Sequence, residues 1–237
     1  MKEEGYFRKE NCRICRSTSL VKVVELTPTP PGNNFLSKDQ IGIKEKEYPL
    51  ELHFCNNCCH VQLGHVVDPS LLFQNSYSYV SGTSPVFVNH LNEYAEYIID
   101  LFDLEKSSLI VDIGSNDGTC LKEFKKLGFR VCGVDPASLP AQLANEAGID
   151  TLNLFFDEIA VDKIVTTNGK ADFVTSHNVL AHVDDLGTVF RNIHRLLKVG
   201  GYFCFEIGYF KEVLKTGCFD TIYHEHLDYH HAKPLAR

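Results

Sequence analysis

The stretch Val111-Asp112-Ile113-Gly114-Ser115-Asn116-Asp117-Gly118-Thr119 decides the fold of this chain. Residues 109–113 form a short apolar run that predicts a strand. The two glycines predict a tight turn, and a helix is expected from Thr119 onward. A strand, a glycine turn and a helix in that order bring the backbone close to a cofactor at the end of a parallel strand. The run 131–135 ends a second predicted strand on Asp135, 21 positions after Gly114, near the ~20-residue spacing expected for an acid that binds ribose hydroxyls.

The charge of this loop indicates which nucleotide it binds. Three residues, 115–117, separate the two glycines, so the loop is not the G-x-G-x-x-G of dinucleotide enzymes. A dinucleotide places its pyrophosphate at the helix N-terminus, where Asp117 would repel it. S-adenosylmethionine carries a sulfonium and an amino group, which suit Asp112 and Asp117. We therefore predict S-adenosylmethionine as the cofactor and disfavour a dinucleotide oxidoreductase; the alternative is an ordinary strand, turn and helix with no ligand.

Apolar segments of two kinds alternate through the second half of the chain. Strands are expected at 109–113, 130–134, 171–176 and 202–207, and helices at 87–101, 121–127, 140–147 and 186–197. The tyrosine-rich run 74–84 is expected to be a loop. Alternating strands and helices predict an α/β fold, a mostly parallel Rossmann-like sheet with helices on both faces. Its ligand belongs at the carboxyl ends of the strands.

Four cysteines in two C-x-x-C pairs predict a small N-terminal zinc-binding domain. The pairs are Cys12 with Cys15 and Cys55 with Cys58, and together they would close a tetrahedral site of four thiolates. The run 27–32, rich in proline, is expected to supply the loop between the pairs. Such a closed site leaves no open position, so we expect structural rather than catalytic zinc; His60 is a possible substitute ligand, and free thiols or a redox pair are the alternatives.

The composition limits the class of protein. The chain has 237 residues, 44% of them hydrophobic, and a formal net charge of −8, so a broad basic surface for nucleic acid is not expected. The first five residues lack the apolar run of a signal peptide, and no apolar run approaches the ~18 residues that span a bilayer. We therefore expect a cytoplasmic protein without a membrane or nucleic-acid partner. An RNA methyltransferase that reads its substrate with the zinc module is a disfavoured alternative.

Residues that can move protons gather after the later predicted strands. The segment 177–183 follows one strand, and Tyr223-His224-Glu225-His226-Leu227 is the densest acid–base cluster of the chain. A histidine accepts protons near neutral pH, a neighbouring carboxylate supports its cation, and a tyrosine can donate to an oxyanion. Structural alternatives exist: His177 and His182 can be core or cap histidines. His224 and His226 could share a metal if they lie on a strand, and His230 and His231 could join them.

At this point the chain resembles the deoxysugar C-methyltransferases that act on nucleotide-linked keto-sugars. The pieces that match, in order, are the paired C-x-x-C module and the segments 77–84, 112–119, 177–183 and 223–227. The resemblance implies a zinc-binding N-terminal domain, a central S-adenosylmethionine domain, and methyl transfer to a sugar carbon beside a ketone. It also implies that His226 is the general base, that Glu225 and Tyr223 are its neighbours, and that Tyr77 or Tyr79 closes over the substrate.

One departure from that family concerns the end of the sequence. Members of the family normally continue past Y-H-E-H-L into another α/β domain that helps to hold the nucleotide-sugar, whereas this sequence stops at Arg237. Donor binding is expected to survive such a loss, and a partner chain could supply the missing domain. A protein that binds the donor without turnover, or half of a split enzyme, is therefore the alternative to an active enzyme.

These inferences give a domain plan and a set of candidate residues. We expect a zinc-binding domain at 1–70, a tyrosine-rich loop and linking helix at 71–105, and an S-adenosylmethionine-dependent methyltransferase domain at 106–237. The expected donor-binding residues are Asp112, Gly114, Asn116, Asp117, Gly118, Thr119, Asp135, Pro136, His177, Asn178 and His182.

Overall fold

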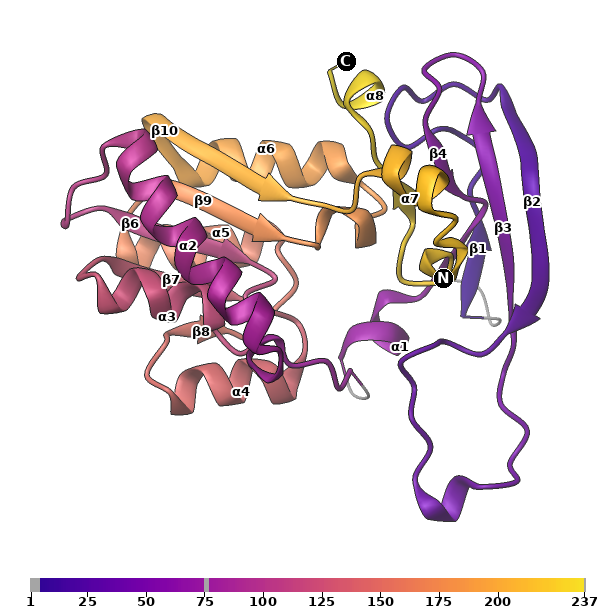
Figure 1. Cartoon of the computed structure of the whole chain (residues 1–237), viewed down its shortest axis with the longest axis horizontal. Coiled ribbons are helices and arrows are strands. Elements are labelled where there is room, and N and C mark those ends of the chain that lie inside the picture. Colours follow the sequence, from indigo (N-terminus) through magenta and orange to yellow (C-terminus); the bar gives the residue numbers. More distant parts are fainter. Residues whose placement is uncertain (1–4, 75–76, 237) are drawn as a thin grey trace. The chain divides into compact units, whose positions relative to one another are not determined.

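The computed structural model describes residues 5–74 and 77–236, and the chain divides into two compact units (Figure 1). Unit 1 comprises Met1–Tyr77, Asn178–Gly187 and Ile207–Arg237. Unit 2 comprises Ser78–His177 and Thr188–Glu206. Each unit is therefore assembled from separate segments of the sequence, and each is described by itself below.

Unit 2 is built on a five-stranded sheet whose paired strands all run parallel. The strand order is β10-β9-β6-β7-β8. All five residues of β6 are buried, which explains its continuous apolar sequence. Because the chain leaves β6 toward β7 on one side and later returns to β9 on the other, the carboxyl end of β6 is the switch point at which open α/β sheets bind ligands. The strands are β6 (Leu109–Ile113), β7 (Arg130–Val134), β8 (Thr151–Leu152), β9 (Ala171–His177) and β10 (Leu197–Glu206).

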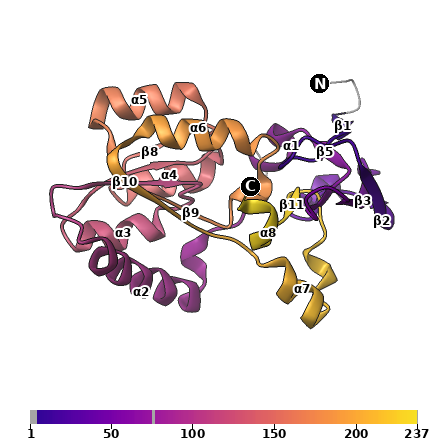
Figure 2. The same cartoon turned by 90° about the horizontal axis from the view of Figure 1, so that it is seen from above.

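Helices cover both faces of this sheet. Figure 2 shows α5 and α6 on one face and α2 and α3 on the other. Leu91, Ala95 and Ile98 of α2 pack with Phe124 of α3 and Phe173 of β9 in the main core. The helices are α2 (Pro85–Phe102), α3 (Thr119–Lys126), α4 (Ser138–Glu146), α5 (Glu158–Asn168) and α6 (Leu186–Leu196), and a 3₁₀ turn, η2 (Ser81–Thr83), precedes α2.

The predicted α/β class, the parallel sheet and most of its elements are confirmed, with three differences. Helix α4 begins at Ser138, because Pro140 is tolerated in a first turn whose N–H groups need no helical partner. Strand β10 begins at Leu197, with an irregular register before Tyr202. Strand β8 and helix α5 were not predicted. Asn75 and Ser76, in the predicted tyrosine-rich loop, lie outside the described residues.

Unit 1 is built on an antiparallel sheet of order β11-β4-β3-β2, with a separate pair formed by β1 and β5. Alternate residues of β3 and β4 bury Leu50, Leu52, Val61 and Leu63 against Leu227. The strands are β1 (Tyr6–Arg8), β2 (Leu20–Thr29), β3 (Tyr48–Cys55), β4 (Val61–Leu63), β5 (His65–Val67) and β11 (Asp228–Tyr229). The helices and 3₁₀ turns are η1 (Lys38–Gln40), α1 (Pro69–Phe73), η3 (Leu180–His182), α7 (Phe210–Thr216), η4 (Phe219–Thr221) and α8 (Ala232–Leu235).

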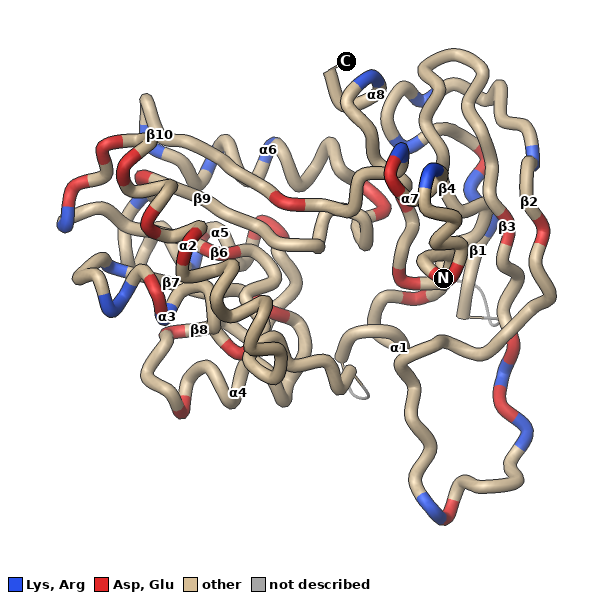
Figure 3. Tube along the Cα trace, in the orientation of Figure 1, with Lys and Arg blue, Asp and Glu red and all other residues tan. Residues whose placement is uncertain are grey.

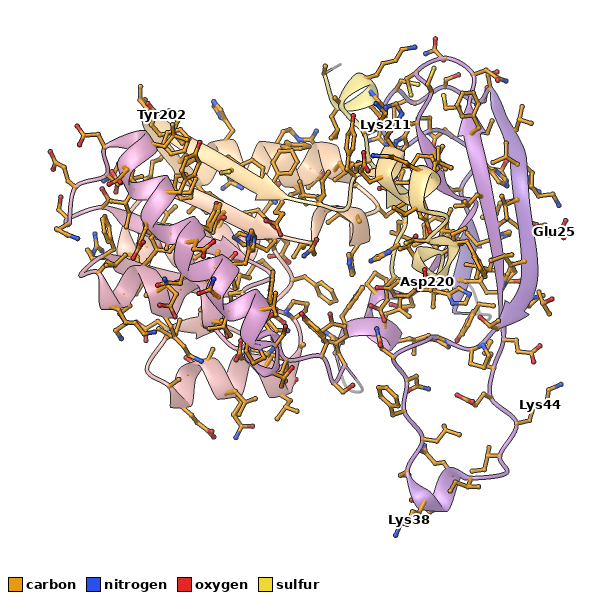
Figure 4. The ribbon with its side chains drawn as sticks, viewed as in Figure 1. Glu25, Lys38, Lys44, Tyr202, Lys211 and Asp220 are labelled. Carbon is orange, nitrogen blue, oxygen red and sulfur yellow. The ribbon has the colours of Figure 1, made fainter. Side chains whose placement is uncertain are left out.

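One expectation for unit 1 was wrong, and the condition for one alternative is not met. The loop expected at 27–32 begins later, because β2 continues through Thr29. That loop then runs to β3, and its Lys38 and Lys44 point away from the sheet (Figure 4). His224 and His226 do not lie on a strand: they occupy turns before β11 begins at Asp228. Their side chains therefore need not share one side.

The chain has a formal net charge of −8. Acidic and basic residues are interspersed along the trace of each unit (Figure 3). Within the described residues, no helix combines the length and apolarity that crossing a membrane requires.

Candidate functional site

Asp135, at the end of β7, holds the glycine turn that follows β6. Its Oδ2 accepts a hydrogen bond from the Asn116 N–H at 2.8 Å, and its Oδ1 accepts one from the Ala137 N–H at 2.8 Å. Burial raises the pKa of this carboxyl. A carboxylate oxygen can accept two hydrogen bonds, so Asp135 still has capacity for the ribose hydroxyls of a nucleotide. Pro136 follows it directly.

Asp112 lies in β6 next to this acid and is only 2% exposed. Its Oδ1 is buried without a hydrogen-bond partner among the described residues. Burial, and then the charge of Asp135, raise the pKa of Asp112 well above its usual value. A buried acceptor without a partner is costly, and a cationic ligand group would satisfy it. The residues present therefore fit S-adenosylmethionine, whose amino and sulfonium groups are positive.

Asp117 occupies the N-terminal end of α3. Its Oδ1 accepts hydrogen bonds from the N–H and the hydroxyl of Thr119, at 3.3 and 2.6 Å, and its Oδ2 lies 3.7 Å from Lys122 Nζ. A pyrophosphate would need these helix-terminal donors, which Asp117 already uses. Gly114 and Gly118 on either side have φ angles of 70° and 75°, a left-handed conformation that favours glycine.

The side chain of Asn116 joins the glycine turn to the tyrosine-rich segment. Its Nδ2 donates to the Tyr79 carbonyl at 3.0 Å, and its Oδ1 accepts from the Ser81 N–H at 2.8 Å. Asn116 also has a positive φ of 50°, which asparagine tolerates better than most residues. The predicted cofactor-binding residue thus fixes the backbone of residues 79–81 within unit 2.

His177, at the end of β9, is packed inside unit 2. Its Nε2 lies 3.1 Å from Thr175 Oγ1 and 3.6 Å from Cys120 Sγ, and its ring makes an edge contact with Tyr94 at 4.6 Å. Burial lowers the pKa of His177 to about 4. A neutral imidazole held in this way suits a structural role, the alternative that the sequence offered to donor binding. Tyr94, whose hydroxyl lies 2.7 Å from Thr175 Oγ1, was not among the predicted site residues.

The four predicted zinc ligands come together in unit 1. The Sγ atoms of Cys12, Cys15, Cys55 and Cys58 all lie within 4.8 Å of one another. The Cys12–Cys58 and Cys15–Cys55 Sγ distances are 3.5 and 3.6 Å. Four thiolates about 2.3 Å from a tetrahedral zinc ion would be about 3.8 Å apart, so the set fits structural zinc. His60 is not part of this group, and its Nε2 is bonded to Asp228 Oδ1 at 2.6 Å.

The Y-H-E-H-L segment places an oriented histidine beside a tyrosine in unit 1. His226 Nδ1 lies 2.9 Å from the Thr221 carbonyl, and His226 Nε2 lies 2.9 Å from the Tyr223 hydroxyl. A carbonyl can only accept, so Nδ1 carries the hydrogen and, in the neutral ring, Nε2 is the acceptor. Burial lowers the pKa of His226, which keeps the ring neutral at neutral pH. The partners of the two ring nitrogens therefore define which nitrogen of His226 can accept a proton.

Three aromatic side chains extend this cluster. The His182 ring makes an edge contact with the His226 ring at 5.1 Å, and Phe73 packs on His182 at 5.4 Å. Tyr77 contacts Phe73 in turn, with ring centroids 5.7 Å apart. His182 and Tyr77 therefore belong to the unit that carries His226, whereas Tyr79 belongs to unit 2. Asn178, with a positive φ of 58°, is the first residue of the segment that returns to unit 1.

Glu225 is buried beside the cluster at 2% exposure. Its Oε1 accepts a hydrogen bond from Asn33 Nδ2 at 2.7 Å. Burial raises the pKa of Glu225, and the Asn33 bond opposes that rise. Asn33 was not predicted, because it lies 192 residues away in the sequence and nothing in its local pattern indicates a site.

The alternative of a shared histidine metal site is not supported. Each Nε2 of the four histidines has a separate partner: a carbonyl oxygen of Tyr48 for His224, of Leu180 for His230 and of Cys59 for His231, and the Tyr223 hydroxyl for His226. Among the described residues, the four cysteines are the one group that could hold a metal ion.

Comparison with known proteins identifies two family models in the chain. A model described as "Putative zinc binding domain" matches residues 12–73, and a model described as "Methyltransferase domain" matches residues 87–237. The chain is 33% identical over 220 residues to C-methyltransferase NovU from Streptomyces niveus, which covers 93% of this chain and 52% of NovU. It is 32% identical over 100 residues to a ubiquinone biosynthesis O-methyltransferase from Albidiferax ferrireducens, covering 41% of this chain and 40% of that protein.

Solved structures resemble part of the chain. The PH0226 protein from Pyrococcus horikoshii is 18% identical with a TM-score of 0.48, covering 58% of this chain and 62% of that one. The chain spans about half the length, or less, of the two curated relatives described above.

Proposed function

We propose, because this chain belongs to the methyltransferase-domain family, that it is an S-adenosylmethionine-dependent C-methyltransferase acting on a nucleotide-linked keto-deoxysugar, with His226 as the base. The similarity to a protein named C-methyltransferase supports transfer to carbon. The chain covers about half of that relative, so its own turnover is part of the proposal.

The observation that carries this proposal is the orientation of His226. Its Nδ1 is bonded to the Thr221 carbonyl and its Nε2 faces the Tyr223 hydroxyl. Methylation of carbon needs a base, because carbon becomes nucleophilic only when a proton beside a carbonyl is removed. Neutral His226 meets that need, because its Nδ1 donates to a carbonyl and its Nε2 can accept a proton.

In the proposed reaction, His226 Nε2 takes the proton from the sugar carbon beside the ketone. The electron pair of the broken C–H bond moves into an enolate, and Tyr223, or Tyr77 or Tyr79, donates a hydrogen bond to the enolate oxygen. Glu225 orients His226 or a sugar hydroxyl. S-adenosylmethionine, held by Asp112 and Asp135, would supply the methyl group to the enolate carbon, and the carrier would leave as a neutral thioether when its sulfonium–methyl bond breaks.

Solvent deuterium exchange tests the base directly. With a nucleotide-linked keto-deoxysugar and no donor, the protein should exchange the proton beside the ketone, and His226→Asn should slow exchange by about 10²-fold or more. Titration calorimetry should show unchanged S-adenosylmethionine affinity in this variant. The exposed His194 gives the matched control, His194→Asn, which should keep both properties. Exchange and methylation that persist in His226→Asn would contradict the assignment.

A second candidate is a methyltransferase that acts on another small molecule. The 32% identity over 100 residues to a ubiquinone biosynthesis O-methyltransferase favours this alternative. Calorimetry with S-adenosylmethionine and a dinucleotide separates donor binding from the disfavoured oxidoreductase. Product analysis with the keto-sugar then separates binding from catalysis.

A further inference from the structure

Arg13 is a buried cation inside the first cysteine knuckle. It follows Cys12 directly, its residue is 1% exposed, and its side chain is fully buried. A buried guanidinium is costly unless its charge and its N–H groups are paired. The hydrogen-bond partners of Arg13 therefore indicate the role of this buried side chain.

Three of the four partners lie in the segments that carry His182 and His226, and the fourth is in β4. Arg13 Nε donates to Asp184 Oδ1 at 2.9 Å. Its Nη1 donates to the Leu227 carbonyl at 3.3 Å and to the Leu63 carbonyl of β4 at 2.9 Å. Asp228 Oδ1 lies 4.0 Å from the same Nη1. One planar side chain thus ties the knuckle to residues 184 and 227 at once, a geometry suited to arginine rather than lysine.

Both tied residues are close neighbours of the acid–base cluster. Asp184 comes two residues after His182, and Leu227 comes directly after His226. The rings of these histidines contact each other at 5.1 Å. The Nη2 of Arg13 remains buried without a partner among the described residues, so this arrangement is not optimised for stability alone.

We propose that Arg13 is a positioning residue, which sets the placement of His226 by fixing the backbone at Leu227 and at Asp184 to the cysteine knuckle. The inference rests on the proposed function, because it assumes that His226 is the base. Arg13 acts through backbone and carboxylate contacts and touches no substrate. A small displacement of a catalytic group can cost as much as 10²-fold in rate, so a modest shift of residue 227 should be visible in turnover.

The test compares Arg13→Lys with Asp184→Asn, a milder change that removes the charge of one partner and keeps the shape. Arg16→Gln is the matched control, because Arg16 lies in the same knuckle and its ion pair with Asp185 is exposed. Each variant is examined as the full chain for zinc content, S-adenosylmethionine affinity, solvent deuterium exchange on the keto-sugar, and the ¹³Cε1 NMR pH titration of His226. The groups that face His226 are Tyr223, His182 and the Thr221 carbonyl.

We expect both Arg13→Lys and Asp184→Asn to keep one zinc per chain and the donor affinity. Arg13→Lys should slow exchange at least tenfold and shift the His226 titration, Asp184→Asn should do so to a smaller extent, and Arg16→Gln should do neither. If Arg13→Lys does not fold, Asp184→Asn decides. Folded variants with wild-type exchange and an unchanged His226 signal would overturn the proposal. If the wild type itself shows no exchange, the proposed function fails, whereas the His226 signal still reports on Arg13.

Discussion

At the scale of single residues, Gly82 is where the tyrosine-rich segment meets the glycine loop of unit 2. A Cβ atom at this position would lie 2.5 Å from Asp117 Oδ2 and 3.1 Å from Thr119 Oγ1. Gly82→Ala must therefore displace Asp117 from the end of α3. We expect a loss of about 1–3 kcal/mol in stability from overpacking, and weaker S-adenosylmethionine binding because the loop moves.

Gly208→Ala is the control for this change, since no heavy atom lies within 4 Å of its added Cβ. Denaturant titration and calorimetry measure the two effects. Equal donor affinity in Gly82→Ala and the wild type would show that the loop tolerates the displacement.

The lowered pKa of His182 leads to a separate prediction about how stability depends on pH. Burial, and then the neighbouring His226, lower the pKa of His182 to about 3. In the unfolded chain a histidine has a pKa of about 6.5, so the unfolded state binds the proton first as pH falls. The free energy of unfolding is therefore unaffected by His182 above about pH 6.5. Below that pH, protonation of the unfolded state lowers it, by up to about 2 kcal/mol at pH 5.

His182→Phe should remove this part of the pH dependence while keeping a ring against Phe73. The measurement is the free energy of unfolding of the variant and the wild type at pH 7.5 and pH 5. His194→Phe serves as the control, because His194 is exposed and solvent reaches it in both states. Parallel pH curves for His182→Phe and the wild type would contradict the assignment.

At the scale of elements, the sequence predicted well wherever an apolar run ends at a glycine or an acid. Strands β6 and β7 match their predicted bounds, because β6 is a continuous buried run and β7 is buried over its last three residues. Strand β2 was predicted less well, because the prolines at its end resemble a loop. It is an edge strand that pairs with β3 alone, and an edge position can accommodate Pro28, which has no N–H to donate.

Helix α5 escaped prediction for a different reason. It buries only Ala160, Val161 and Ile164, and its interior contains β-branched residues that have weak helix propensity. Its start depends on Asp157, whose carboxylate accepts a hydrogen bond from the Ala160 N–H at 2.9 Å. The partner of Glu225 in the candidate site was also not predictable from local sequence, because only the tertiary fold brings Asn33 to Glu225.

The two cysteine pairs lead to a prediction about the effect of zinc on stability. Structural zinc contributes to folding because four thiolates converge only in the folded state. Cys15→Ser should therefore lose zinc and lower the melting temperature of unit 1 by on the order of 10 °C, given several kcal/mol lost and about 2–4 °C per kcal/mol.

Cys218→Ser is the matched control, because Cys218 is exposed and lies outside the cluster. Zinc released on thiol modification and calorimetric melting provide the readouts. A zinc-free Cys15→Ser variant that melts with the wild type would show that the metal does not stabilise the unit.

At the scale of the whole molecule, each unit is assembled from segments that are distant in sequence. Unit 1 takes its first segment from Met1–Tyr77 and completes its sheet with β11, near the end of the chain. Local patterns predict elements and the residue types of a site, but they do not indicate which segments return to which unit. The zinc ligands were predictable because their spacing is local within each pair, whereas the contacts of Arg13 with residues 184 and 227 were not.

This interleaving predicts that residues 1–77 cannot form a stable domain by themselves, even with all four cysteines. The fragment lacks β11, whose Asp228 and Tyr229 pair with β4. It also leaves Arg13 without Asp184 and His60 without Asp228, and removing one partner from a buried charged pair is strongly destabilising, at about 3–5 kcal/mol. A loss of that size is comparable to the whole stability of many small domains.

We therefore expect fragment 1–77 with equimolar zinc to give poorly dispersed amide NMR signals and no cooperative melt, whereas the full chain should melt cooperatively. A fragment in which residues 178–187 and 207–237 are joined to 1–77 by flexible linkers should recover dispersion, because it restores both Asp184 and β11. The same joined fragment with Asp228→Ala is the matched control and should recover much less. If 1–77 and zinc alone gave the dispersed spectrum of a folded domain, the later segments would be dispensable for this unit, and the buried partners of Arg13 and His60 would not be needed to hold it.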